Sequence, residues 1–400
     1  MKVLVINSGS SSIKYQLLDM ENEFILCSGL VERIGEETGS LTHKAAPDSG
    51  AAEKITLEQP IPNHEIGMTL AIDLICGEKG VVKDKCEITA IGHRIVHGGE
   101  TLHQPTLVDD AVVEELEKLI PLAPLHNPGH LAGINVARRL FPEVPQVVVM
   151  DTAYHQTLPP EAYMYALPYD LYDELRIRRY GFHGTSHAFV AKEAARIVGK
   201  PFDEFNVITV HLGNGCSMTA TKNGKAVDTS MGITPLEGLV MGTRSGDVDP
   251  ALHALLARTR DMTSEQVDTM LNKESGLKGL CGMNDMRDIH AAIEKGDEKA
   301  KLALDVQTYR NRKYIGSFMA VLGRVDAIVF TAGIGENDSI VRRESVKGLE
   351  CFGIKIDENE NNQRAKGPLK ISTADSAVAI WVIPTNEELA IARETKELVN

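Results

Sequence analysis

The sequence predicts an α/β protein built from two similar halves. Its 400 residues exceed what one ordinary hydrophobic core accommodates, so two domains are expected. The stretch 207–225 repeats the design of residues 5–19, an apolar strand, a Gly-containing turn and an alternating strand, with Gly213 aligned to Gly9. Further apolar strands alternate with amphipathic helical segments. These observations favour a duplicated α/β domain, with both turns acting on one ligand.

Each remaining expected strand runs directly into polar or Gly-rich residues, where ligands of α/β sheets collect. Apolar runs predict these strands at 88–92, 146–150, 326–330 and 379–383. Helical periodicity is clearest at 110–120, 186–198, 297–322 and 386–398, with Asn386 a suitable N-cap for the last. Residues 36–64 look like an elaborated hairpin, and the Pro/Tyr-rich stretch 155–172 is either a linker or a dimer surface.

Composition excludes several classes of partner. The formal charge is −14, from 56 acidic and 42 basic side chains, and no basic run is concentrated enough for nucleic acid or an acidic membrane surface. Six cysteines form no CxxC pair and no metal-ligand spacing, so we expect reduced thiols in a cytoplasmic protein. Met1-Lys2 leads straight into a strand, leaving no room for a signal sequence, and no apolar run approaches the ~20 residues that a membrane span needs.

The first Gly/Ser loop, SGSSS at 8–12, has two interpretations. Small residues let the backbone approach an anion, which suits phosphate. The alternative is a simple hairpin turn. A Walker A loop is excluded, because that motif enters a helix, whereas Ile13, Tyr15 and Leu17 alternate with polar residues as in a strand.

A third Gly turn is expected at 331–337, TAGIGEN, where it could hold a nucleotide's sugar and base. Polar residues that follow expected strands or lie in Gly-rich turns form a distinctive set: Arg94, Asp151, His183, Arg244 and Glu387. Each alone could be a surface ion-pair partner, a loop histidine or a cap. Together, arginines and a histidine suit a phosphoryl group in transfer, and carboxylates suit a bridging metal ion.

These motifs resemble the acetate kinase family of the acetate and sugar kinase, Hsp70 and actin superfamily. The resemblance runs in order from residue 5 to 388 through NSGSSSIKYQLLD, GHRIVHGG, PLAPLHNPGH, VVMDTAYHQTLP, RRYGFHGTSH, VHLGNGCS, MGTRSGDVDP, TAGIGEN and PTNEE. It implies two ribonuclease-H-like domains facing across a nucleotide cleft, ATP:acetate phosphotransferase activity within acetyl-CoA biosynthesis, Mg²⁺ (with Mn²⁺ as a substitute) and a homodimer.

The resemblance also implies domain roles and site residues. Residues 1–151 with 386–400 would form the acyl-substrate and metal domain with a returning C-terminal helix, and 152–385 the nucleotide-binding and dimerisation domain. The metal residues are Asn7 and Glu387, the substrate arginine is Arg94, and the catalytic residues are Asp151, His183 and Arg244. The ATP-binding residues are Lys14, Ser10, Ser12, His211, Leu212, Gly213, Asn214, Gly215, Asp285, Met286, Arg287, Gly333, Ile334, Gly335, Glu336 and Asn337.

The chemistry can also be argued from the residues. A carboxylate acceptor is ionised near neutral pH, so attack on the γ-phosphorus needs no general base. Arg94 suits acetate and Arg244 the phosphoryl group, while His183 can donate to an equatorial oxygen, in a direct in-line transfer. Because the substrate has no proton to lose, we expect Asp151 to orient an arginine or a metal-bound water.

The family's acyl pocket falls on four apolar residues: Val96, Leu125, Phe182 and Pro235. They suit a methyl group, although apolar residues are more often simply core. A pocket separates one methylene by only ~1 to 3 kcal/mol, so a propionate kinase or a broader short-chain acyl kinase stays open as an alternative.

Two other classes of protein share some of these sequence features. Three His pairs at i, i+4 (93/97, 126/130 and 183/187) have zinc-ligand spacing, but no HExxH appears and Gly or Pro beside each pair is expected to spoil the helix. An ATPase like actin or Hsp70, without an acyl acceptor, would share the phosphate loops but gives no reason for Arg94, His183 and an apolar pocket.

Overall fold

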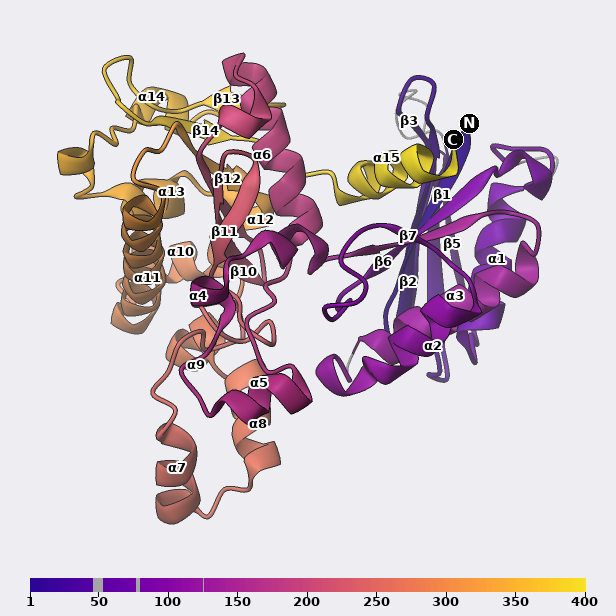
Figure 1. Cartoon of the computed structure of the whole chain (residues 1–400), viewed down its shortest axis with the longest axis horizontal. Coiled ribbons are helices and arrows are strands. Elements are labelled where there is room, and N and C mark those ends of the chain that lie inside the picture. The colour runs from indigo at the N-terminus through magenta and orange to yellow at the C-terminus, as the bar shows by residue number, and fades with distance from the viewer. Residues whose placement is uncertain (46–52, 77–79, 125) are drawn as a thin grey trace. The chain divides into compact units, whose positions relative to one another are not determined.

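The computed structural model describes residues 1–45, 53–76, 80–124 and 126–400. The chain divides into two compact units: unit 1 comprises Met1–Ala153 and Asn386–Asn400, and unit 2 comprises Tyr154–Thr385. Both termini therefore belong to unit 1, as the indigo and yellow segments of Figure 1 show.

Unit 1 is built on a sheet with the strand order β5-β4-β3-β2-β1-β6-β8-β7. Its strands are β1 (Lys2–Ser8), β2 (Ser12–Asp19), β3 (Phe24–Glu32), β4 (Gly39–Ala45), β5 (Glu53–Gln59), β6 (Ala90–Ile95), β7 (Thr106–Leu107) and β8 (Gln146–Met150). β1, β6 and β8 are parallel neighbours, while β1 to β5 form an antiparallel meander. The carboxyl ends of three strands therefore meet at one edge.

Helices cover both faces of this sheet, because successive side chains of β1 point to opposite sides. The helices are α1 (His64–Ile75), α2 (Asp110–Lys118), α3 (Asn127–Leu140) and α15 (Glu387–Val399). Val3 and Val5 pack with Ile391 of α15, whereas Leu4 and Ile6 pack with Met68 of α1 and Val136 of α3. The final helix starts as expected, since the side chain of Asn386 accepts the N–H of Leu389.

Unit 2 repeats the central topology with the order β11-β10-β9-β12-β14-β13. Its strands are β9 (Val207–Leu212), β10 (Cys216–Lys222), β11 (Lys225–Thr229), β12 (Ala327–Thr331), β13 (Leu369–Lys370) and β14 (Ala379–Val382). The β9–β10 hairpin corresponds to β1–β2, and β12 and β14 run parallel to β9 as β6 and β8 do to β1. The predicted duplicated α/β fold is confirmed.

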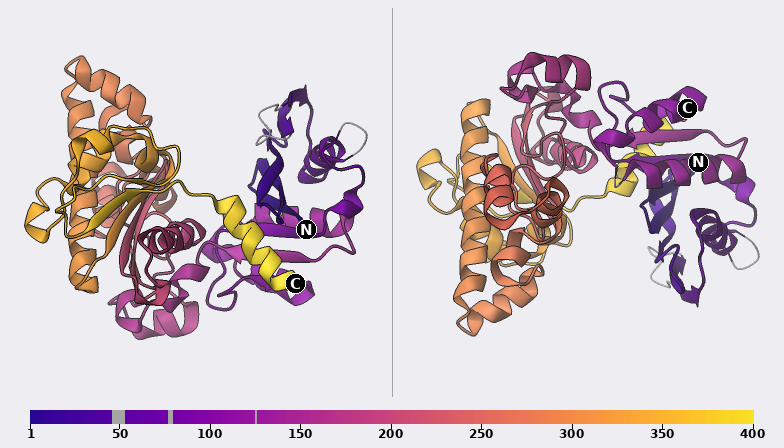
Figure 2. Two further views of the ribbon diagram at one scale, coloured as in Figure 1. Left: turned by 90° about the horizontal axis from the view of Figure 1, so that it is seen from above. Right: turned by 90° about the horizontal axis from the view of Figure 1, so that it is seen from below.

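The helices of unit 2 are α4 (Pro160–Tyr163), α5 (Tyr169–Leu175), α6 (Gly184–Val198), α7 (Leu252–Arg260), α8 (Ser264–Lys273), α9 (Gly276–Cys281), α10 (Met286–Glu294), α11 (Glu298–Leu322), α12 (Ala332–Asn337), α13 (Ser339–Val346) and α14 (Glu358–Asn361). Figure 2 shows the long α11 beside the sheet of unit 2. On the sheet face that carries Val207 and Val329, α6 buries Val190 and Ala194.

The Gly turn predicted at 331–337 is wrong. Thr331 ends β12, and residues 332–337 form the helix α12. The Glu336 carboxylate Oε1 accepts the N–H of Ala332 at 2.9 Å and so satisfies one donor of the first turn. The spacing of Gly333 and Gly335 carries no signal for this contact, which comes from a side chain within the helix.

Candidate active site

The carboxyl edge of the unit 1 sheet gathers Asn7, Arg94 and Asp151. Asn7 lies in β1, Arg94 in the adjacent β6, and Asp151 directly after β8. The parallel register pairs Ile6 with His93 and Arg94 with Val149. Asn7, Arg94 and Asp151 therefore lie at the ends of three neighbouring strands.

Arg94 is held by a two-point contact with Asp151. Its Nε donates to Oδ1 at 3.1 Å and its Nη2 to Oδ2 at 2.7 Å, while Oε2 of Glu387 lies 3.8 Å from Nε. The Asp151 side chain is 2% exposed and that of Arg94 is 22% exposed. Burial alone would lower the pKa of Arg94, but the charges of Asp151 and Glu387 raise it above its ordinary value. The guanidinium is thus a permanent, oriented cation.

A neutral histidine supports the segment after β6. Nε2 of His130 accepts the N–H of Val96 at 3.2 Å. Burial and the nearby charge of Arg94 lower the pKa of His130 to about 3, so the ring carries no charge at neutral pH.

The predicted loop after β1 is a tight hairpin turn in which the N–H of Gly9 donates to the carbonyl of Ser12 at 2.8 Å. Helix α3 packs directly on it. A Cβ at Gly129 would lie 2.6 Å from the Gly9 carbonyl carbon, and a Cβ at Gly133 would lie 2.5 Å from the Ser8 Cβ. Glycine is therefore required twice on this face of α3. Ser10 is exposed and Ser12 is half-buried on the turn.

Lys14, on the strand that follows, forms an ion pair with Glu388 in the first turn of α15. Because Glu388 lies in the first turn of α15, its negative charge also interacts favourably with the positive end of the helix dipole.

In unit 2, the turn 213–215 between β9 and β10 lies against a histidine and an arginine. Gly213 donates its N–H to the carbonyl of Gly215 at 3.0 Å. A Cβ at Gly215 would lie 3.4 Å from Nε2 of His183 and 3.5 Å from Nη1 of Arg244. The turn is thus flanked by a guanidinium and an imidazole, the pair that suits a phosphate group.

His183 lies in an unusual backbone position. It is the N-cap of α6 with φ 58° and ψ 23°, in the left-handed region that non-glycine residues rarely adopt. Its ring stacks on that of His211 with centroids 4.1 Å apart, and its Nδ1 lies 2.8 Å from Oγ of Ser217. His187, one turn further along α6, contacts the same hydroxyl through Nε2 at 2.7 Å.

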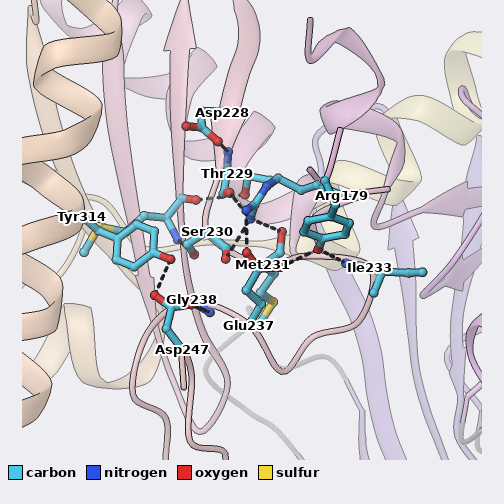
Figure 3. Close-up of polar contacts among 12 residues, drawn as sticks. Arg179, Asp228, Thr229, Ser230, Met231, Ile233, Glu237, Gly238, Asp247 and Tyr314 are labelled. Atoms are coloured by element: carbon cyan, nitrogen blue, oxygen red, sulfur yellow. Dashed lines mark hydrogen bonds and ion pairs between the residues drawn. The ribbon is translucent and has the colours of Figure 1, made fainter. Parts of the chain in front are cut away.

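Arg244 lies within the segment 229–247, which a partly buried polar network contacts. Figure 3 shows Arg179, Glu237, Asp247 and Tyr314 of this network. Arg179 Nη1 donates to the carbonyls of Thr229, Ser230 and Met231 at 2.9, 3.2 and 3.2 Å, and Nη2 donates to Oε1 of Glu237 at 2.5 Å. Tyr165 donates to the other oxygen of Glu237.

Asp247, at the C-terminal end of the segment 229–247, belongs to the same polar network. It accepts the N–H of Gly238 at 2.7 Å and the hydroxyl of Tyr314 at 2.8 Å. Gly238 has φ +106°, and a Cβ there would lie 2.5 Å from the Ser230 carbonyl oxygen. Between these anchors, Nη1 of Arg244 donates to the carbonyl of Pro235 at 3.2 Å, and burial lowers the pKa of Arg244.

Helix α12 is held from its C-terminal side by Arg342, which is 1% exposed. Nη1 of Arg342 donates to the carbonyls of Gly335 and Glu336, both at 3.0 Å, while Nε and Nη2 donate to Asn361. Burial lowers the pKa of Arg342 to about 10. The Asn337 side chain donates to the carbonyl of Gly333 at 2.9 Å, and Ile334 lies between the two glycines.

Residues 285–287 start α10. Asp285 caps the helix by accepting the N–H of Arg287 at 2.9 Å, and its carboxylate also pairs with the Arg287 guanidinium, which is 90% exposed. Met286 is buried. His290 of the same helix donates to Oδ2 of Asp338 at 2.7 Å, which ties α10 to the start of α13.

The apolar residues assigned to the acyl pocket fall in different parts of the chain. Val96 is buried in unit 1, Phe182 is buried in unit 2, and Pro235 is half-buried on the segment that carries Arg244. Leu125 lies outside the described residues.

A magnesium ion would find suitable donors in unit 1. Asn7 and Glu387 offer an amide and a carboxylate oxygen, and α15, which carries Glu387, packs on β1 and β6. Mg²⁺ takes one or two such oxygens together with phosphates and water, so this donor set fits. For zinc, the described parts of the chain hold no group of three His, Cys, Asp or Glu side chains placed for a metal ion. The expectation that Gly or Pro would spoil the helix at each His pair is wrong for two pairs, because His130 lies within α3 and His187 within α6, with His126 and His183 as the N-caps.

Sequence reasoning missed the residues that support the site: Ser217, Arg179, Glu237, Asp247 and Arg342. The partners Arg179 and Glu237 are 58 positions apart, and those of Arg342 include Asn361, 19 positions away. No periodicity or local spacing signals such pairs. Ser217, Arg179 and Asp247 lay within the quoted motifs VHLGNGCS, RRYGFHGTSH and MGTRSGDVDP, but the sequence assigned them no role.

Comparisons with known proteins match the whole chain. Residues 2–393 match the model of the acetokinase family. An acetate kinase of Oleidesulfovibrio alaskensis is 61% identical over 394 residues, which cover 98% of both chains. The crystal structure of Porphyromonas gingivalis acetate kinase superposes with a TM-score of 0.95 at 42% identity over 100% of both chains. A propionate kinase from Francisella tularensis superposes at 0.92 with 42% identity over 99% of both chains.

The duplicated fold and these full-length matches define a phosphoryl-transferring enzyme of the α/β kinase class. The chain belongs to the acetokinase family. Within the described residues, no helix is both long and apolar enough to cross a bilayer.

Proposed function

We propose that this protein is an acetate kinase, which transfers the γ-phosphoryl group of ATP reversibly to acetate and gives acetyl phosphate and ADP. The observation that carries the proposal is the glycine turn of unit 2, flanked by the Nε2 edge of His183 and the guanidinium of Arg244. A full-length relative with 61% identity supports the same activity.

The proposed division of roles follows the two units. Unit 1 takes acetate, whose carboxylate Arg94 binds, and unit 2 takes ATP. Arg244 and His183 stabilise the charge on the phosphoryl oxygens during a direct in-line transfer. Because the acceptor is already ionised, the site needs no general base.

The nucleotide is proposed to contact the turn 213–215 with His211 and Leu212, the helix α12, and residues 285–287. Support comes from their proximity: the Cβ position of Gly213 lies 3.9 Å from the Cβ of Ala332, and His290 ties α10 to the cap of α13. In unit 1, Ser10, Ser12 and Lys14 are proposed to complete the phosphate contacts.

Asn7 and Glu387 are proposed to hold Mg²⁺. When bound, the ion neutralises charge on the phosphate oxygens. Asp151 is proposed to orient Arg94 and not to carry a proton, because both of its carboxylate oxygens already accept from that guanidinium.

Propionate is a second candidate acceptor, since a propionate kinase is 42% identical over almost the full chain. The apolar residues Val96, Leu125, Phe182 and Pro235 are proposed to favour acetate. One methylene changes transition-state binding by ~1 to 3 kcal/mol, so propionate is expected to be a poorer substrate and not an excluded one.

We also propose that the enzyme is a cytoplasmic homodimer that dimerises through unit 2. Reduced thiols suit that compartment, and all six cysteines, each within the described residues, are free. Light scattering of the purified protein tests the assembly, and a monomer at micromolar concentration would refute it.

The activity is tested by measuring ATP consumption with Mg²⁺ and acetate, propionate, butyrate or no acceptor, and by trapping the product as a hydroxamate. Acetate-dependent turnover with acetyl hydroxamate is expected, and chelation of Mg²⁺ should abolish it. ATP hydrolysis without an acceptor would instead support an ATPase of the actin or Hsp70 type.

A further inference from the structure

A chain of buried hydrogen bonds runs from the β9–β10 hairpin to His183. Thr209 Oγ1 lies 2.6 Å from Nδ1 of His187, whose Nε2 lies 2.7 Å from Oγ of Ser217. Ser217 Oγ in turn lies 2.8 Å from Nδ1 of His183. Thr209, His187 and Ser217 are all fully buried. None of these three residues belongs to the phosphate or acetate contacts proposed above.

The donor and acceptor in each hydrogen bond of this series can be assigned, because the series ends on a main-chain carbonyl. Thr209 donates its hydroxyl to the carbonyl of Thr219 at 3.4 Å, and a carbonyl can only accept. With its own proton directed at that carbonyl, Thr209 accepts from the Nδ1–H of His187. Burial, together with His155 and His211, lowers the pKa of His187 well below its ordinary value, so the ring is neutral and its Nε2 accepts from Ser217. Ser217 is left to accept the Nδ1–H of His183.

A second, separate series of hydrogen bonds gives His211, whose ring stacks on that of His183, the same tautomer. Ser186 donates its hydroxyl to Thr385 at 2.9 Å, so it accepts from Nδ1 of His211, which lies 2.9 Å away. The rings of His183 and His211 stack at 4.1 Å with an interplanar angle of 17°. Both therefore carry their fixed proton on Nδ1.

We propose that Thr209, His187 and Ser217 are positioning residues that hold His183 as its Nδ1–H tautomer. The Nε2 atom, on the ring edge next to Gly215, then accepts in the neutral ring and donates only in the imidazolium. For phosphoryl transfer, this makes His183 a charge-assisted donor, stronger than a neutral N–H. The catalytic meaning rests on the proposed kinase function, whereas the tautomer itself does not.

The sharpest test is Thr209→Val, a substitution of similar shape. Thr209 does not contact His183 directly, because His187 and Ser217 lie between them in the series of hydrogen bonds. Without the threonine oxygen, His187 has no acceptor at Nδ1 and moves its proton to Nε2. It then donates to Ser217, whose hydroxyl turns to His183 Nδ1, and His183 in turn carries its proton on Nε2. His187 and His183 each keep one ring proton in this change. The proton leaves one ring nitrogen for water, and water returns a proton to the other nitrogen.

The measurement is ¹⁵N NMR of the unliganded, histidine-labelled enzyme at a pH where the rings are neutral, with His183 assigned by His183→Gln. We expect a protonated Nδ1 in the wild type and a protonated Nε2 in Thr209→Val. Thr221→Val is the matched control, since this buried threonine of the same hairpin contacts Tyr154 and lies outside the chain. It should leave the His183 signals unchanged.

Ser217→Ala supplies a second variant if Thr209→Val folds poorly, and it should remove the wild-type preference for a protonated Nδ1. In turnover, both variants should lower kcat by about 10- to 100-fold, the usual cost of losing an outer hydrogen-bond partner, with little change in KM for ATP. A wild-type His183 protonated on Nε2, or a tautomer that neither variant alters, overturns the proposal. Because the spectra need no substrate, they remain decisive even if the acceptor assay rejects the kinase.

Discussion

Arg94 donates to both carboxylate oxygens of Asp151, from Nε at 3.1 Å and from Nη2 at 2.7 Å, and the carboxylate is almost completely buried. A carboxylate in this position sets the orientation of the guanidinium. The remaining edge of the guanidinium is then available in one fixed direction.

Asp151→Asn is expected to lower kcat/KM for acetate by about 100-fold, because a misplacement near 1 Å has that effect on transfer. The loss should be nearly independent of pH if Asp151 orients Arg94. Rate profiles from pH 5 to 9 for both proteins check this. Disappearance of one limb of the wild-type profile would instead assign proton transfer to Asp151.

Arg94→Lys keeps the charge but cannot make the two-point contact with Asp151. Loss of one charge-assisted hydrogen bond costs about 1.5 to 3 kcal/mol, so KM for acetate should rise about 10- to 100-fold. KM for ATP serves as the internal control and should stay within about twofold. Equal increases in both constants would contradict a role confined to acetate.

His290 and Asp338 should make stability depend on pH. The hydrogen bond to Asp338 raises the pKa of His290, so the protonated form is favoured in the folded state. The extra stability is therefore complete below about pH 6.5, the unfolded value, and is lost as pH rises through the higher folded pKa. Urea unfolding of wild type and His290→Gln at pH 5.5 to 9 should show a difference that shrinks with rising pH. A gap that widens toward pH 9 would show the opposite linkage.

Glu237→Gln should weaken the network that holds the Arg244 segment. It replaces an ion pair with Arg179, whose side chain is 16% exposed, by a neutral contact. We expect a loss of about 1 to 3 kcal/mol in unfolding free energy and a several-fold lower kcat. Glu193→Gln, which removes an exposed pair with Arg196, is the control and should change stability by less than about 1 kcal/mol. Equal effects of the two substitutions would argue against a special role for Glu237.

Arg342→Met should destabilise unit 2 by about 3 kcal/mol or more, because it leaves carbonyls of Gly335, Glu336 and Asn361 without their donor. KM for ATP should rise as α12 loses its support. Arg343→Met, on the same helix but 38% exposed, is the matched control for both measurements. Thermal unfolding and ATP titration of the two variants distinguish a buried clamp from a general effect of removing charge.

The sequence by itself determined the class of fold and the residues of the candidate site. Alternating apolar residues predict both hairpins, since side chains of a strand must face either core or solvent. The structure confirms the duplication that the similarity of 207–225 to 5–19 indicates. Polar residues after apolar runs located Arg94 and Asp151 one by one, because strand ends are marked locally in the chain.

Only the tertiary structure decided which of these groups touch. The pairing of Arg94 with Asp151 requires β6 and β8 to lie side by side, and the chain from Thr209 to His183 requires α6 to pack on β9 and β10. The prediction of a turn in place of α12 was wrong, because the hydrogen bonds of the Glu336 carboxylate and the Arg342 guanidinium to this helix depend on the folded structure. Partners such as Arg94 and Asp151, 57 positions apart, leave no local pattern, since their contact depends on how whole elements pack, and that contact sets the orientation of the guanidinium.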